Sequence, residues 1–171
     1  MGFNLAILIS GKGSNMLNIV EACNNKTLSS KVKIVISNNK NSSVLTKVEK
    51  KGIKTKIIHE NQINKFEKKL SQTLHEEKIN FVCLAGFMRI LSKGFLCNWE
   101  KKIINIHPSI LPAFKGLNAV KKALEKKVKY TGCTIHYVDK GVDTGEIIDQ
   151  RIVKVLKTDN EEILAKKILK E

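Results

Sequence analysis

The segment Asn105–Pro112, Asn-Ile-His-Pro-Ser-Ile-Leu-Pro, carries the residues of this chain best suited to chemistry. It continues a short apolar run that is typical of a strand, and residues two apart on a strand project from the same face. Asn105 and His107 are therefore expected side by side, where Pro108 and Pro112, the two prolines of the chain, end the strand. Open α/β sheets place their functional groups at such strand ends. Asn can donate a hydrogen bond to a developing oxyanion and His can move a proton near neutral pH, so the pair indicates chemistry at a carbonyl group.

Histidines also occur as packed core residues satisfied by the backbone, and the chain has three besides His107. His59 and His75 have the surroundings of surface or structural residues. His136 lies in the alternating stretch 134–138 and either faces the site or packs in the core; the pattern leaves both open. For His107 we favour a functional role, because an asparagine shares its face and prolines fix the path of the chain after it.

The glycine-flanked acidic loop 139–145 supplies a carboxylate that could orient a histidine. Asp139 is expected to close a β-turn, a common role for Asp in such loops. Asp143 is the better candidate for a partner of His107, since a carboxylate beside an imidazole fixes its tautomer and orientation.

Two further loops follow predicted strands and suit ligand binding. Ile9–Asn15, Ile-Ser-Gly-Lys-Gly-Ser-Asn, joins a strand to a helix, and its glycines can turn backbone N–H groups toward an anion. The loop is neither a P-loop nor a dinucleotide fingerprint, because Met16 stands where the third glycine of the fingerprint belongs. Gly86–Leu91 could hold a flat heteroaromatic ligand through main-chain hydrogen bonds. Taken singly, each loop fits an ordinary turn equally well.

The alternation of apolar runs and helical periodicity predicts an α/β protein with a mainly parallel sheet, helices on both faces and antiparallel C-terminal strands. Strands are expected at Leu5–Ile9, Val32–Ile36, Ile53–Ile58 (an edge), Phe81–Ala85, Ile103–Ile106, Thr131–Val138 and Glu146–Leu156. Helices are expected at Asn15–Asn24, Val44–Lys51, Gln62–Lys78, Leu91–Glu100, Leu117–Lys126 and Asp159–Glu171. The last helix is predicted to begin with Asp159 as its cap. Its packing stripe is expected to consist of Ile163, Leu164, Ile168 and Leu169.

The composition limits the classes of protein to which this chain can belong. The 171 residues are 42% apolar, enough for one domain with a core, and no run approaches the length of a membrane span. The net charge of +15 comes almost entirely from dispersed lysines, which is typical of solvated helix faces rather than a nucleic-acid site. Four separate cysteines form no zinc motif, and Cys83 and Cys133 are expected in the core. We expect a cytoplasmic protein without nucleic-acid or membrane partners.

These segments, in this order, resemble the phosphoribosylglycinamide formyltransferase family. The resemblance is carried by Ile9–Asn15, Leu84–Leu91, Asn105–Pro112, Thr131–Val138 and Asp143–Glu146, and it covers essentially the whole chain. It implies a Rossmann-like single domain, residues 1–171, that transfers a formyl group from 10-formyltetrahydrofolate to 5-phosphoribosylglycinamide in purine biosynthesis. Both partners would be small molecules, no metal would be needed, and the protein would be a monomer or homodimer.

The resemblance also implies residue roles. Asn105, His107 and Asp143 would be catalytic, with Asn105 and protonated His107 stabilising the oxyanion. The substrate would be bound by Gly13, Ser14, Asn15, Asn105 and Glu171. The folate would be bound by Met88, Arg89, Ile90, Leu91, Asp139, Lys140, Gly141, Val142 and Asp143.

The chain departs from the family pattern after the catalytic strand. Ala113–Gly116, Ala-Phe-Lys-Gly, stands where relatives commonly have Lys-Tyr-Pro-Gly, and Asn118 replaces the histidine that usually follows. A basic residue near the third strand contacts folate in relatives, and Lys65 is the nearest candidate here.

The alternative functions each require a sequence feature that we do not expect in this chain. A formyltetrahydrofolate hydrolase usually carries an N-terminal regulatory domain, which we do not expect because the first strand begins at Leu5. A methionyl-tRNA formyltransferase would need a C-terminal tRNA-binding domain. A basic nucleic-acid module would cluster arginines and aromatic residues, and this chain does not. A degenerate, inactive paralogue is the remaining alternative.

Overall fold

The computed structural model describes residues 2–171 as two compact units. The first ends at Ile103 and the second runs from Ile104 to Glu171. Strand β5 (Ile103–His107) belongs to the second unit apart from its first residue.

The first unit is built on parallel strands in the order β3-β2-β1-β4. Their bounds are β1 Asn4–Ile9, β2 Lys31–Ser37, β3 Lys54–Ile57 and β4 Phe81–Leu84. β1 is buried from Leu5 to Ile9, as its unbroken apolar run predicts for a central parallel strand. β3 carries lysines and lies at the edge, where charged side chains discourage further strand pairing.

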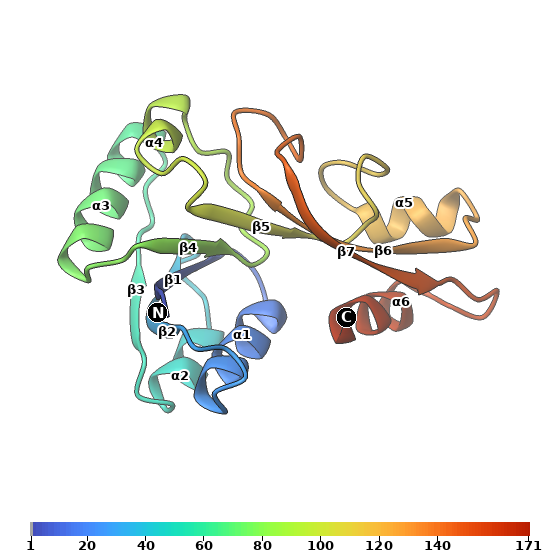
Figure 1. Ribbon diagram of the computed structural model, residues 1–171, viewed down its shortest axis with the longest axis horizontal. Helices are drawn as coiled ribbons and strands as arrows, with labels where there is room; N and C mark the ends of the chain where they lie inside the picture. The colour runs from blue at the N-terminus through green and yellow to red at the C-terminus, as the bar shows by residue number, and fades with distance from the viewer. Residues whose placement is uncertain (1) are drawn as a thin grey trace. The chain divides into compact units, whose positions relative to one another are not determined.

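Helices cover both faces of these strands. Their bounds are α1 Ser14–Asn24, α2 Val44–Glu49, α3 Ile63–Glu76 and α4 Lys93–Cys97. Figure 1 shows α1 and α2 on one side of the parallel strands and α3 on the other. Phe66, Leu70 and Leu74 form the fully buried stripe of α3, with the spacing of one helix face.

The second unit is an antiparallel sheet of β5, β6 (Tyr130–Tyr137) and β7 (Ile147–Lys154) with two helices, α5 (Ala119–Glu125) and α6 (Glu161–Lys170). Cys133 on β6 and Val153 on β7 pack against Leu164 and Ile168 of α6. The predicted α/β class is therefore confirmed: mainly parallel strands, helices on both faces, and antiparallel strands toward the C-terminus.

The cysteine prediction is also confirmed, since Cys83 and Cys133 are buried and the four cysteines are free thiols. Burial raises the pKa of the Cys83 thiol to about 12, so it packs as an uncharged side chain. No helix among residues 2–171 is long and apolar enough to cross a bilayer.

Two predicted helix ends were wrong for the same reason. α4 begins at Lys93 and not at the predicted Leu91, because Ser92 accepts a hydrogen bond from the Phe95 backbone N–H and caps it, and the helix ends at Cys97 instead of Glu100. α6 is capped by Asn160, whose side chain accepts from the Ile163 N–H, and not by Asp159. In the predicted packing stripe of α6, Leu164 and Ile168 are buried, whereas Ile163 is exposed.

Asp159 instead connects the segment before α6 to a residue within that helix. Its Oδ2 accepts from the Leu156 backbone N–H at 2.9 Å, and both of its oxygens lie 2.7 Å from Lys167 Nζ. The Leu156 hydrogen bond, and then that of Lys167, holds the pKa of Asp159 below its ordinary value. A carboxyl pKa lowered by folding contributes stability above the unfolded value of about 4, and this contribution is lost as the pH falls through the folded value.

We therefore predict that Asp159→Asn lowers the melting temperature at neutral pH, and that the gap to wild type narrows below a pH of about 4. Asp149→Asn is the matched control, because the Asp149 side chain is 47% exposed and pairs with Arg151 at the surface. Thermal unfolding across pH measures both. If the difference in melting temperature between wild type and Asp159→Asn does not depend on pH, the loss comes from the altered shape of the side chain and not from its charge.

Candidate active site

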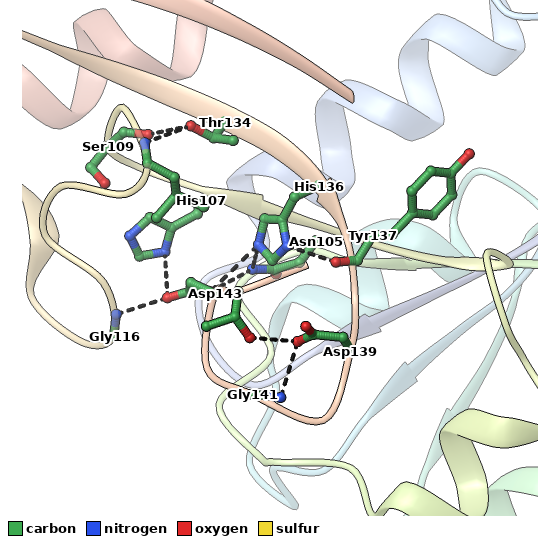
Figure 2. A network of polar contacts seen from close by, with 12 residues as sticks. Asn105, His107, Ser109, Gly116, Thr134, His136, Tyr137, Asp139, Gly141 and Asp143 are labelled. Carbon is green, nitrogen blue, oxygen red and sulfur yellow. Dashed lines mark hydrogen bonds and ion pairs between the residues drawn. The ribbon is translucent and has the colours of Figure 1, made fainter. Parts of the chain in front are cut away.

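The antiparallel register of β5 and β6 brings the polar side chains of both strands together. Asn105 pairs with His136, and His107 pairs with Thr134. Asn105 and His107 lie on one face of β5 as predicted, and Figure 2 shows both beside Asp143. The sequence left the orientation of His136 open; the structure places it in this group, buried and opposite Asn105.

Asp143 lies at the centre of the group and contacts Asn105, His107 and His136. Its Oδ2 lies 3.1 Å from His107 Nδ1 and accepts from the Gly116 backbone N–H at 2.7 Å. Its Oδ1 accepts from Asn105 Nδ2 at 3.4 Å and lies 3.5 Å from His136 Nε2. The Asp143 side chain is only 11% exposed, so these partners replace most of the water that an ionised carboxylate needs.

The two ring nitrogens of His107 both face acceptors. Nδ1 faces the Asp143 carboxylate, and Nε2 lies 2.9 Å from the backbone carbonyl oxygen of Phe114. A carbonyl oxygen can only accept, so Nε2 donates in this arrangement. Nδ1 also donates when the ring carries both protons, and that form satisfies both contacts. His107 is therefore oriented to present an N–H to a carbonyl oxygen.

His136 and Asn105 form a second pair. His136 Nδ1 lies 2.8 Å from the Tyr137 carbonyl oxygen, which requires a proton on Nδ1. Nε2 then accepts from Asn105 Nδ2 at 3.2 Å. The Asn105 amide donors thus reach His136 and Asp143 at distances that are long for an N–H donor, so neither contact holds the amide tightly.

A buried hydroxyl fixes the chain that leaves β5. Thr134 Oγ1 donates to the Ser109 carbonyl oxygen at 2.7 Å and accepts from the Leu111 N–H at 3.1 Å and from Gln150 Nε2 at 3.0 Å. The segment that follows His107 is therefore held to β6 by side-chain hydrogen bonds rather than by a strand ladder.

The loop that carries Asp143 is folded on itself. Asp139 Oδ1 accepts from the Gly141 N–H and the Thr144 hydroxyl, which confirms its predicted turn role. A Cβ on Gly145 would lie 1.8 Å from the Tyr137 carbonyl oxygen, so only glycine allows this approach. The close approach anchors the loop next to β6 and sets the position of Asp143.

The predicted ligand loops belong to the first unit. Gly13 has φ 70° and caps α1, whose first turn holds no acidic residue, and no capping side chain accepts from the N–H groups of that turn. In the second loop Met88 and Ile90 are exposed, whereas Leu91 is buried. The Arg89 side chain is turned inward, over the Phe66 ring at 4.5 Å.

The two departures from the family pattern are also located. Phe114 and Asn118 both have positive φ, 55° and 59°. Asn118 caps α5 without a side-chain hydrogen bond to that helix. Lys65 is exposed on α3. Within residues 2–171, no group of three or more His, Cys, Asp or Glu side chains is arranged to hold a metal ion.

The chain belongs to the formyl transferase family, whose model matches residues 3–171. It is 43% identical over 168 residues to the trifunctional purine biosynthetic protein adenosine-3 of Homo sapiens. That match covers 96% of this chain but 16% of the human protein, so the chain spans only a small part of that relative's length.

Solved structures agree over nearly the whole chain. Glycinamide ribonucleotide transformylase 1 from Symbiobacterium toebii has a TM-score of 0.94 and 37% identity, with 99% of this chain and 81% of that chain covered. Phosphoribosylglycinamide formyltransferase from Anaplasma phagocytophilum has a TM-score of 0.91 and 42% identity, with 99% and 80% covered.

Thr134→Val tests the hydroxyl that holds the segment after His107. Valine keeps the shape but removes the acceptor of the Leu111 N–H and the donor to the Ser109 carbonyl oxygen, so we expect a loss of about 1–3 kcal/mol in the free energy of unfolding. Urea denaturation measures it. The matched control is Thr131→Val on the same strand, where the buried Thr131 Oγ1 has no hydrogen-bond partner among residues 2–171. That change should be neutral or stabilising; equal losses in both variants would contradict the assigned role.

Proposed function

We propose that this chain is a phosphoribosylglycinamide formyltransferase, and that residues 1–171 form its formyltransferase domain. It would transfer the formyl group of 10-formyltetrahydrofolate to the amine of 5-phosphoribosylglycinamide in purine biosynthesis. The observation that carries the proposal is the Asp143 carboxylate, which holds His107 beside Asn105 at the end of β5. Membership of the formyl transferase family and the likeness to enzymes named for this reaction support it.

His107 supplies a proton-bearing nitrogen aimed at a carbonyl oxygen. In the structure this oxygen is that of Phe114. The formyl oxygen of the bound 10-formyltetrahydrofolate is an acceptor of the same kind, and it would take the place of the Phe114 oxygen. His107 Nε2–H then stabilises the oxyanion that forms when the substrate amine attacks, and it can pass its proton to the leaving nitrogen.

Asn105 is the second donor. Because its contacts to His136 and Asp143 are long, its amide can redirect one N–H to the same oxyanion at little cost. His136 stays behind it as a neutral acceptor and limits the rotation of the amide.

Asp143 stabilises the positive ring of His107 and keeps its plane fixed. It also binds the Gly116 N–H, so the loop 113–116 and the histidine share one anchor. Displacing the Phe114 oxygen from His107 therefore need not release the loop from Asp143.

The binding roles implied by the family resemblance are proposed for the corresponding residues. Gly13, Ser14 and Asn15 at the start of α1 suit a phosphate, because N–H groups at a helix start favour an anion. The exposed side chains of Met88 and Ile90, with the backbone of Arg89 and Leu91, suit the pterin. Contacts to the folate are also proposed for Lys140, Gly141 and Val142, between Asp139 and Asp143, and the exposed Glu171 would contact the ribonucleotide.

Both proposed substrates are small anions found in the cytoplasm, and the net charge of +15 favours their approach to the protein. We propose that the protein is a monomer or homodimer and that it works without metal, membrane or nucleic-acid partners.

The direct test mixes the protein with 10-formyltetrahydrofolate, with and without 5-phosphoribosylglycinamide, and follows tetrahydrofolate release. Release that depends on the ribonucleotide is expected. Release at the same rate without it would identify a hydrolase, and no release in either mixture would identify an inactive relative.

Asn105→Ala should lower kcat by roughly 100- to 1,000-fold, about 2.7–4 kcal/mol of transition-state stabilisation, the scale of a lost oxyanion donor. His107→Ala should reduce turnover to a small residual rate without unfolding the chain. His75→Ala, at an exposed position on α3, is the control and should keep wild-type kcat. Near wild-type turnover in a folded Asn105→Ala or His107→Ala variant would exclude the role assigned to that residue.

A further inference from the structure

The first unit contains a buried carboxylate that the catalytic group does not use. Glu67 lies on α3 and is only 8% exposed. Its Oε1 accepts from the Ser92 backbone N–H at 2.6 Å, and its Oε2 accepts from the Ser92 hydroxyl at 2.6 Å. Both carboxylate oxygens are thus committed to one residue, at the distance of strong, charge-assisted hydrogen bonds.

Ser92 is the last residue of the loop that follows β4 and the cap of α4. Its Oγ accepts from the Phe95 N–H at 3.2 Å while it donates to Glu67. The other end of the loop is also tied down, because Ser10 donates its backbone N–H to the Gly86 carbonyl oxygen and its Oγ accepts from the Met88 N–H. Hydrogen bonds therefore fix both ends of the loop 86–92.

The residue before Glu67 supports the middle of the same loop. The buried Phe66 ring stacks with Phe87 at 5.9 Å between centroids, and the Arg89 guanidinium lies over it at 4.5 Å. Arg89 also donates to the backbone carbonyl oxygens of Glu60 and Asn61. These contacts turn Phe87 and Arg89 inward and leave Met88 and Ile90, 64% and 69% exposed, as the outward side chains.

We propose that Glu67 is a positioning residue for the folate subsite: through Ser92 it fixes the loop whose backbone and outward side chains receive the pterin. This rests on the proposed function. A buried carboxylate with both oxygens bonded to Ser92 is costly to separate from it, so the loop is held in one conformation before the ligand arrives. A loop ordered in advance loses less conformational entropy on binding, and the affinity for the folate is higher for that reason.

The test compares Glu67→Gln and Ser92→Ala with wild type in steady-state formyl transfer, varying each substrate in turn. For Glu67→Gln we expect the KM for 10-formyltetrahydrofolate to rise about tenfold, which corresponds to about 1.4 kcal/mol, near the lower end for a hydrogen bond to a charged group. Ser92→Ala keeps the backbone bond and should give a smaller rise, roughly threefold. The KM for 5-phosphoribosylglycinamide and kcat at saturating folate should stay near wild type.

Glu76→Gln is the matched control, because Glu76 lies on the same helix, is exposed and bonds only to the neighbouring turn at Gln72 among the contacts described. It should leave both KM values unchanged. Calorimetric titration with tetrahydrofolate, the reaction product, gives a second readout that does not need turnover.

The failures of the two proposals are distinguishable. An inactive wild-type protein would contradict the proposed function itself. An active wild type with an unchanged folate KM in both variants would overturn the role of Glu67, and so would an equal rise in both KM values together with a lower melting temperature, which would mark a general support of the fold. If Glu67→Gln does not fold, Ser92→Ala decides alone by the same criteria.

Discussion

The second unit is organised around one buried charge, the Asp143 carboxylate. A carboxylate that is 11% exposed needs several donors, and here they come from Asn105 and His107 on β5 and from the Gly116 N–H in the loop before α5. Satisfying Asp143 therefore fixes β5 and the loop before α5 at once. The chain places Asp143 at φ 51°, in the left-handed region that Asp tolerates better than most residues, with Gly145 close behind it. The loop geometry, the orientation of His107 and the path of residues 113–116 all follow from this arrangement.

The donors of Asn105 and His107 face acceptors that belong to the protein itself. His107 donates to the Phe114 oxygen, and the Asn105 amide is shared between His136 and Asp143. Substrate binding at this site would thus exchange one carbonyl partner for another rather than desolvate bare donors, which lowers the cost of forming the reactive complex. The replacement of the family's Lys-Tyr-Pro-Gly by Ala113–Gly116 is then of direct interest, because the exchanged oxygen belongs to Phe114 in that stretch.

Side-chain chemistry at fixed spacing could be predicted from the sequence, whereas backbone contacts could not. Asn105 and His107 are two apart on a strand, so their shared face follows from strand geometry alone. His136 stayed open because its orientation depends on the register of β6 against β5, and a shift of one residue would have turned it away. The Phe114 and Gly116 contacts come from backbone atoms and leave no trace in residue types. The sequence did not distinguish Glu67 from the other charged residues of α3, because its burial depends on where Ser92 lies.

The same division holds for the fold. Central strands were predicted to within a residue or two, because unbroken apolar runs such as Leu5–Ile9 fit few other environments. Helix starts were wrong where one side chain decides the cap, at Ser92 for α4 and at Asn160 for α6. At α6 the neighbouring Asp159 offered an equally good capping group.

The dependence of catalysis on the Asp143–His107 pair is measured most directly by a double-mutant cycle on kcat/KM for formyl transfer, with Asp143→Asn, His107→Ala and the double variant. If Asp143 acts mainly through His107, its substitution should cost much in the wild-type background and little once the imidazole is gone, so the two losses will be far from additive. Losses that multiply, each as large in the double variant as alone, would show that the two residues act independently and would contradict the central role given to their contact.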